Sequence, residues 1–444
     1  MANQLIPVAF YSRENNSGTY TSAGASDVSG TCSQVFKIGF NCSAIKVVYS
    51  NYTAQTPESA NFSDLSLQTF IQTTADVGTP AQVNFGGGLG VIVKGGHELV
   101  SDSFVGTFTA GQYIAIRTYA SWPSLGTFPL LPLTNSSAIT GSTATTGNNY
   151  VHNGGNGSIQ AQTAGASSTW TSSNNTPGFG AIMILGYASD GVLRGVVGLA
   201  GDSIQNGSNE QGDGTGGAAV RALTSLSIPY VTLANAGEKV YGVKDGSGYS
   251  FRYRRALDAG VTVWVSEYGT NDAEISGDSY AAIKANSLTY WAHLAQNGAA
   301  IIPVTLLPRS SGTFATNAGQ TVSTHLATFQ SFNAYLRAPV SSGAGNSARF
   351  DAAALNINMP YIIDAASYVE TDALNSTPGG PSAPLTSGKW YTGAGNNTAY
   401  TNDGTHPSAN GVTLMVPAFT GAQAAILATA PASPSGGLRF ARRL

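Results

Sequence analysis

Two short segments of this 444-residue chain hold residue types that acyl transfer requires. That chemistry needs a hydroxyl nucleophile, a base, a group that orients the base, and donors aimed at the developing oxyanion. Ser203, in GDSI (201–204), supplies a hydroxyl. His406, in DGTHP (403–407), could accept its proton, because imidazole groups titrate near neutrality. Asp403 lies three residues before His406 and could hold the imidazole in the required tautomer.

Oxyanion donors are also present in the sequence. The backbone N–H groups of Ser203 and of Gly237, in NAG (235–237), and the side-chain amide of Asn271, in GTND (269–272), could form an oxyanion hole together. Three aromatic residues are further candidates to line a cleft, although core packing explains the first equally well: Trp264, Tyr268 and Trp390.

Each of these motifs also has a purely structural interpretation. GTND could be an Asx-turn, DxxH could be a surface loop, and a second GDS tripeptide occurs at 277–279. No strand is expected before that second copy and a long helix follows it, so Asp278 or Ser279 is predicted to cap the helix. The ordered set of motifs at strand ends favours the catalytic interpretation for the first copy.

After about residue 180, short apolar runs alternate with segments of helical period. The runs are 195–201, 229–235, 261–269, 299–308 and 361–365, and the helical segments are 217–227, 279–296, 321–337 and 408–429. Continuous apolar runs joined by helices are typical of a parallel sheet covered on both faces. Functional groups gather at the carboxyl ends of such strands, where GDSI, NAG and GTND fall. The second half is therefore predicted to be α/β.

The first half is expected to be β-rich. Segments 36–49, 82–94 and 104–120 are rich in β-branched and aromatic residues, while 118–189 contains no Asp, Glu, Lys or Arg. This pattern predicts a β-sandwich or jelly roll. We expect an accessory domain over 1–180, with a carbohydrate-binding or substrate-shaping role, a catalytic domain over 181–435, and a C-terminal tail over 436–444.

Composition excludes several classes of partner. Charged residues make up 10% of the chain and the net charge is −3, so there is no electrostatic footprint for nucleic acid. No segment is long and apolar enough to suggest a membrane span, and the N-terminus does not resemble a signal peptide. The charge-poor, Gly-rich composition suits an extracellular or virion-associated protein.

Other motifs suggest neither a cofactor nor a metal. Cys32 and Cys42 could form a disulfide if the segment between them is a hairpin, but not if it is one strand, and no histidine near them suggests a metal site. The G-x-G-x-x-G at 212–217 starts too far after its strand to bind a dinucleotide. No G-x-S-x-G or HExxH occurs, and His293 and His325 are expected to be structural or solvent-facing.

GDSI, a Gly after the second strand, GTND and DGTHP, in that order, resemble the sequence blocks of the SGNH (GDSL-type) hydrolase family over residues 190–430. Gly207 also fits the GDSI-x-x-G extension. The resemblance implies a flavodoxin-like three-layer α/β/α domain without a cofactor. It implies Ser203 as nucleophile, Asp403 and His406 as the rest of the triad, and Gly237 and Asn271 as oxyanion donors alongside Ser203.

The resemblance also implies a reaction, namely ester hydrolysis through an acyl-enzyme. Family members with β-sandwich appendages often deacylate polysaccharides, so an O-acetylated glycan is the first expectation for the substrate. Short-chain aryl or alkyl esters are the second. A carbohydrate-binding or virion tail protein with a vestigial hydrolase domain is the alternative from another class.

Overall fold

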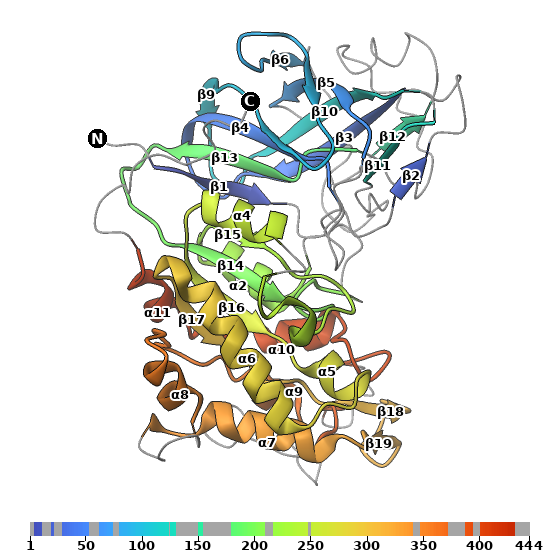
Figure 1. Ribbon diagram of the computed structural model, residues 1–444, viewed down its shortest axis with the longest axis vertical. Helices are drawn as coiled ribbons and strands as arrows, with labels where there is room; N and C mark the ends of the chain where they lie inside the picture. Colours follow the sequence, from blue (N-terminus) through green and yellow to red (C-terminus); the bar gives the residue numbers. More distant parts are fainter. Residues whose placement is uncertain are drawn as a thin grey trace. The chain divides into compact units, whose positions relative to one another are not determined.

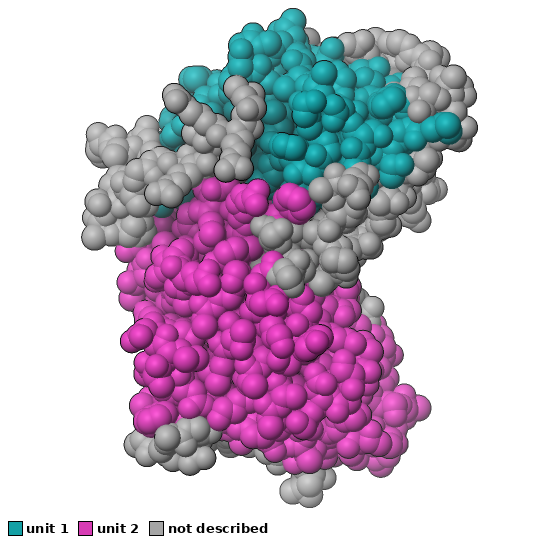
Figure 2. Space-filling view, in the orientation of Figure 1, with its two compact units in different colours: residues 1–193, 212–215, 432–444 teal, residues 194–211, 216–431 magenta. Residues whose placement is uncertain are grey.

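The computed structural model describes residues 4–10, 19–21, 29–52, 62–73, 80–123, 125–129, 150–153, 179–208, 216–246, 250–340, 347–371, 387–393 and 400–430. The chain forms two compact units, which Figure 2 shows in different colours. The first comprises residues 1–193, 212–215 and 432–444, and the second comprises 194–211 and 216–431. Each is described here by itself.

The first unit contains two main antiparallel sheets (Figure 1). One has the order β1 (Leu5–Phe10), β13 (Met183–Ala188), β4 (Cys42–Ser50) and β8 (Glu98–Val100), with β9 (Phe104–Phe108) also paired to β4. The other has the order β12 (Tyr150–Asn153), β3 (Ser29–Lys37), β10 (Tyr113–Ser121), β5 (Leu65–Gln72) and β6 (Ala81–Val83), with β7 (Val91–Val93) paired to β5. A separate pair joins β2 (Thr19–Thr21) to β11 (Thr127–Pro129).

Buried side chains join the faces of these two sheets. The hydroxyl of Tyr49 on β4 lies 2.8 Å from the hydroxyls of Thr69 on β5 and Thr118 on β10. The side chain of Gln34 on β3 bonds the backbone N–H and carbonyl of Ala181, just before β13. The unit is therefore a β-sandwich, as its alternating apolar segments predict.

The cysteine pair does not form a disulfide. Cys42 is buried and takes part in no disulfide, and its Sγ donates to the Phe40 carbonyl at 3.2 Å. It begins β4, whereas Cys32 lies within β3, and these strands belong to different sheets. The chain turns between them, but it crosses from one sheet to the other instead of closing a hairpin. The disulfide interpretation is therefore wrong.

The second unit is built on a parallel sheet with the order β15 (Tyr230–Thr232), β14 (Val196–Gly201), β16 (Val261–Glu267) and β17 (Ala300–Pro303). One face packs in a common apolar core with α2 (Ala218–Ser225) and α10 (Ala409–Thr420). On the other face, Tyr253 of α4 (Ser250–Asp258) stacks on Trp264, and Trp291 of α6 (Tyr280–Leu294) donates to the Ser266 hydroxyl. Helices thus cover both faces, which gives the predicted α/β/α layers (Figure 1).

The remaining elements of this unit are short helices and one hairpin. They are α3 (Val240–Val243), α5 (Thr270–Glu274), η1 (Ala295–Asn297), β18 (Ser310–Gly312), β19 (Gln320–Val322), α7 (Leu326–Arg337), α8 (Ala348–Ala354), α9 (Ala366–Val369) and α11 (Gln423–Leu427).

Several element boundaries differ from those expected. The helix predicted from 321 begins at Leu326, because Gln320–Val322 pairs with β18. The segment predicted as one helix over 408–429 is divided into α10 and α11. The run 361–365 makes only a single parallel bridge, between Ile363 and Val304.

The expected division after residue 180 also differs from the observed units. β13 falls in the first unit because its backbone pairs with β1 and β4. No helix in the described part of the chain combines the length and apolar character that crossing a bilayer requires.

Candidate active site

Ser203, His406 and Asp403 are joined by hydrogen bonds in the second unit. The Ser203 Oγ lies 2.7 Å from His406 Nε2, and His406 Nδ1 lies 2.6 Å from Asp403 Oδ2. Ser203 and His406 are 203 residues apart in sequence, so the fold alone brings them together. The serine is 8% exposed and the imidazole side chain 21%, which leaves the end of the relay open to a small reactant.

The turn that carries Ser203 follows β14 directly. The Asp202 carboxylate accepts from the Ile204 N–H at 2.9 Å, and the Ser203 carbonyl accepts from the Ser208 N–H at 2.9 Å. Gly201 is required at the end of the strand, because a Cβ there would lie 2.5 Å from the Gln205 Cβ and 2.8 Å from the Glu267 carbonyl oxygen. The chain can therefore bend sharply and present the serine hydroxyl at the carboxyl end of the sheet.

The His406 imidazole is held by its own loop. The Asp403 Oδ1 accepts from the N–H groups of Thr405 and His406, both at 2.8 Å, while its Oδ2 faces the imidazole. Burial alone would raise the pKa of Asp403, but the hydrogen bonds from His406 and Thr405 outweigh it and lower that pKa to about 2. The carboxylate is therefore ionised wherever imidazole titrates, and it can stabilise an imidazolium.

Two of the three predicted oxyanion donors are unengaged. Among the described residues, the backbone N–H groups of Ser203 and Gly237 donate to no acceptor. The Asn271 amide differs, because its Nδ2 donates to the Glu238 carbonyl at 3.0 Å and to Asp202 Oδ2 at 3.2 Å. Asn271 would have to release one of these bonds in order to donate to a substrate.

Several bonds attach the Gly237 turn to the nucleophile turn. The Asn235 N–H donates to the Gly201 carbonyl at 3.0 Å, and Asn206 Nδ2 donates to the Ala234 carbonyl at 3.1 Å. Asn271 anchors the other end of the turn, because its Nδ2 donates to the Glu238 carbonyl. The Gly237 N–H is thus located between two anchored points, on the same side of the unit as Ser203.

A buried polar group behind this turn was not predicted from the sequence. The Glu238 carboxylate forms a 2.7 Å ion pair with Arg252, with both side chains 1% exposed, and it also accepts from the Tyr268 hydroxyl. Burial raises the pKa of Asp202 to about 7, although the Ile204 N–H opposes the rise, with Asp272 and Glu238 adding to it. Arg252 belongs to no motif, and Tyr268 is a sequence candidate only for lining a cleft, so the contacts of these residues alone identify the cluster.

The other candidate residues take structural positions. Ser279 caps α6 by accepting from the Ala282 N–H, as predicted for the second GDS. His293 ends α6 against the Tyr253 ring, and His325 precedes α7. Within the described ranges, no cluster of His, Cys, Asp and Glu could hold a metal ion. Of the 212–217 glycine motif, 212–215 lie outside the described residues.

The three aromatic side chains proposed to line a cleft are buried. Trp264 and Trp390 are fully buried and Tyr268 is 4% exposed. The interpretation of Trp264 as a core residue is therefore correct, and the cleft-lining interpretation is wrong for all three. Trp390 nevertheless donates to a carbonyl of the loop that carries His406.

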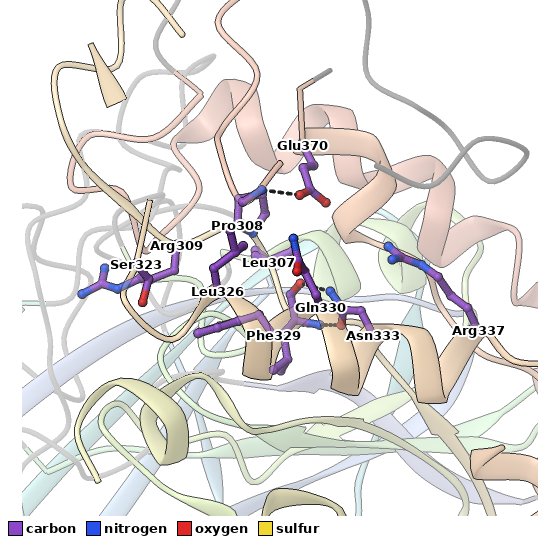
Figure 3. A pocket seen from close by; sticks show the side chains of 12 residues that line it. Leu307, Pro308, Arg309, Ser323, Leu326, Phe329, Gln330, Asn333, Arg337 and Glu370 are labelled. Atoms are coloured by element: carbon purple, nitrogen blue, oxygen red, sulfur yellow. Dashed lines mark hydrogen bonds between the residues drawn. The ribbon is translucent and has the colours of Figure 1, made fainter. Parts of the chain in front are cut away.

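A small pocket in this unit is separate from the candidate site (Figure 3). Its volume is about 20 Å³, which is room for a water molecule. No predicted site residue lines it. Its walls are formed by Leu306, Leu307, Pro308, Arg309, Ser323, Leu326, Phe329, Gln330, Asn333, Arg337, Glu370 and Gly388.

No protein-family model matches the sequence, and no curated protein matches it either. Solved structures do match. A GDSL-like lipase from Bacteroides thetaiotaomicron is 19% identical with a TM-score of 0.32, the match covering 52% of this chain and 89% of that one. A family two carbohydrate esterase from Clostridium thermocellum, in complex with cellohexaose, is 14% identical with a TM-score of 0.35, covering 93% and 100%.

A family two carbohydrate esterase from Cellvibrio japonicus is 11% identical with a TM-score of 0.35, covering 96% of this chain and 95% of that one. With identities of 11–19% and TM-scores of 0.32–0.35, these three similarities assign neither a family nor a reaction to this chain.

Proposed function

We propose that this chain is a serine esterase that hydrolyses carboxylic esters through an acyl-enzyme. The observation that carries the proposal is the continuous hydrogen-bonded relay from Ser203 through His406 to Asp403, at 2.7 and 2.6 Å. A hydroxyl, an imidazole and a carboxylate in that order are the parts of a nucleophile activated by an oriented base.

The proposed reaction has two stages, acylation of Ser203 and hydrolysis of the acyl-enzyme. Ser203 Oγ attacks the ester carbonyl while His406 Nε2 takes the hydroxyl proton. The tetrahedral intermediate then collapses, the bond to the alcohol breaks, and His406 returns the proton to the leaving alcohol. In the second stage a water molecule gives a proton to His406 and attacks the acyl-enzyme carbonyl. The bond to Ser203 Oγ then breaks and His406 returns the proton to that oxygen, which releases the acid and regenerates the serine hydroxyl. Asp403 stays ionised throughout.

The unengaged N–H groups of Ser203 and Gly237 support the proposed oxyanion hole. Donors without an acceptor in the resting site are available to the negative charge that develops on the carbonyl oxygen. Asn271 is the third proposed donor, and it contributes by exchanging one of its two present acceptors for the substrate oxygen.

Substitution of the two GDS serines tests the proposal. Ser203→Ala should reduce kcat for 4-nitrophenyl acetate by ~10⁴-fold or more, because the nucleophile is lost. Ser279→Ala is the matched control: it removes the N-cap hydroxyl of α6, costs about 1 kcal/mol of stability, and should leave kcat unchanged. Full activity in Ser203→Ala would show that the triad assignment is wrong.

Among esters, we propose O-acetyl groups on a polysaccharide as the substrate. A β-sandwich unit accompanies the α/β unit, and the chain presents few charges, which suits a neutral polyhydroxyl surface. Short-chain aryl or alkyl esters are the alternative substrates. The intact relay argues against a binding or tail protein with a vestigial site, because a decayed site would lack one of its members.

Release of acetate from acetylated xylan distinguishes these substrates. The proposal expects release by the unaltered chain and none by Ser203→Ala. Hydrolysis of 4-nitrophenyl acetate without acetate release from any acetylated glycan would instead favour the small-ester alternative. Absence of both activities would support the vestigial interpretation.

A further inference from the structure

Gly404, the residue between Asp403 and Thr405, is held by hydrogen bonds from outside the loop that carries His406. The Gly404 carbonyl accepts two hydrogen bonds, one from the Ser310 N–H at 3.1 Å and one from the indole Nε1–H of Trp390 at 3.0 Å. From within its own loop, Thr401 Oγ1 accepts from the Gly404 N–H at 2.9 Å and donates to the His406 carbonyl at 2.8 Å. Both polar groups of the Gly404 residue are therefore engaged.

One buried side chain connects both residues that bond the Gly404 carbonyl. Gln320 is 3% exposed, and its Oε1 accepts from the Trp390 N–H at 2.8 Å and from the Ser310 hydroxyl at 2.9 Å. Its Nε2 donates to the Trp390 carbonyl at 2.8 Å. The amide thus pairs with the Trp390 backbone in the way a neighbouring strand would, and it joins Trp390 to the β18–β19 hairpin.

The space around Gly404 leaves the loop no room to move toward these partners. Gly404 has a φ of 75°, and a Cβ on it would lie 1.8 Å from the Ser310 carbonyl oxygen and 2.9 Å from the Phe314 ring. Trp390 is fully buried, so its N–H has no water to bond if the Gly404 carbonyl is withdrawn. Movement of the loop would therefore break the hydrogen bond from the indole N–H of Trp390 to the Gly404 carbonyl and leave that N–H buried without an acceptor.

We propose that Trp390 and Gln320 are positioning residues for the catalytic base. Trp390 holds the Gly404 peptide, and Gln320 holds Trp390 and Ser310, so that Asp403 and His406 stay aligned with the Ser203 hydroxyl. Neither side chain contacts the reacting atoms. The inference rests on the proposed esterase function. Because a misplacement of about 1 Å can cost ~10²-fold in rate, loss of this support should lower kcat and leave KM little changed.

Trp390→Phe removes the indole N–H and keeps an aromatic ring. The matched control is Trp264→Phe, since Trp264 is equally buried and its Nε1 has no hydrogen-bond partner among the described residues. With 4-nitrophenyl acetate, and with rates normalised to sites that react with a fluorophosphonate, Trp390→Phe should lower kcat by ~10-fold or more with KM within about twofold. Trp264→Phe should stay within about threefold of the unaltered chain. Equal losses in both variants would overturn the proposal.

Gln320→Met provides a second variant that keeps the length of the side chain but loses its three hydrogen bonds. It should also lower kcat per reactive site while KM stays within about twofold. A purely structural role would reduce the number of sites that react with the fluorophosphonate without lowering kcat per site.

The proposed function and the positioning role can be refuted separately. If Ser203→Ala is fully active, the proposed function is wrong. If Ser203→Ala is inactive while Gln320→Met and Trp390→Phe both keep the original kcat per reactive site, the function stands and the positioning role is refuted.

Discussion

Asp403 illustrates how single residues set the chemistry of this site. Its carboxylate accepts three hydrogen bonds from Thr405 and His406, and each of them favours the ionised form. Because its pKa is about 2, Asp403 stays charged through the mildly acidic range. Protonation of Asp403 should therefore not contribute to any loss of activity between about pH 4 and pH 7.

Asp403→Asn should reduce kcat for 4-nitrophenyl acetate by ~10³–10⁴-fold, because it reverses the imidazole tautomer. The amide oxygen would remain with the Thr405 and His406 N–H groups, so the NH₂ would face His406 Nδ1. The imidazole proton would then sit on Nε2, which could no longer accept from Ser203. Steady-state kinetics on the purified variant check this, and a kcat within about threefold of the original would contradict it.

The residues that sequence reasoning identified are those that belong to motifs. Ser203, Asp403 and His406 lie in GDSI and DGTHP, where residue type, spacing and strand ends all agree. Glu238, Arg252 and Gln320 lie outside such patterns, and Trp390 is a sequence candidate only for lining a cleft. Their significance comes from contacts such as the one between Gln320 and Trp390, which are 70 residues apart. Nothing local in a sequence marks a contact of that separation.

At the scale of elements, the long apolar strands were easier to predict than the short ones. β14 and β16 are buried along nearly their whole length, so their sequences are continuously apolar. The three-residue strands β18 and β19 contain Ser, Gly, Gln and Thr, and their pairing is accompanied by the bonds of Gln320 to Ser310 and Trp390. Tertiary contacts, and not the intrinsic strand propensity of its residues, determine whether such a hairpin forms.

Gly404→Ala tests how tightly this hairpin holds the base loop. The substitution adds a Cβ at a φ of 75° and 1.8 Å from the Ser310 carbonyl oxygen, so the loop must move. We expect a loss of kcat of ~10²-fold. Gly298→Ala is the matched control, because it has a similar φ of 82° but nothing within 4 Å of the added Cβ.

Both variants should lose roughly 1 kcal/mol of stability from the positive φ. Gly404→Ala should lose more stability than this because its loop must move, and it alone should lose activity. Urea unfolding and steady-state kinetics measured on the same preparations separate the two effects. Equal kcat values in the two variants would mean that the hairpin does not constrain the loop.

At the scale of the whole molecule, buried carboxyl groups determine how stability depends on pH. Burial raises the pKa of Asp202 from 3.8 to about 7 and that of Glu370 from 4.5 to about 7, against opposing backbone hydrogen bonds. Burial, with the charge of Asp202 adding to it, also raises the pKa of Glu267 well above its ordinary value. Asp403 is the opposite case, with a pKa lowered to about 2.

The sign of each contribution follows from which state binds protons more tightly. A carboxyl whose pKa is raised on folding holds its proton better in the folded state, so its contribution is present below pH ~4 and is lost as the pH rises toward ~7. The contribution of Asp403 is present above pH ~4 and is lost as the pH falls toward ~2. The free energy of unfolding should therefore be highest near pH ~4 and decline by ~2 kcal/mol or more by pH 8.

Glu267→Gln isolates one of these groups, because it keeps the shape of the side chain and removes its titration. Glu267 is 1% exposed, at the end of β16, so its ionisation at high pH is opposed by burial. The variant should match the unaltered chain at pH 5, exceed it in stability at pH 8, and show a smaller decline between the two. Urea unfolding at both pH values measures this. A decline of the same size in both proteins would mean that Glu267 titrates alike in the folded and unfolded states, and that the pH dependence arises from other carboxyl groups.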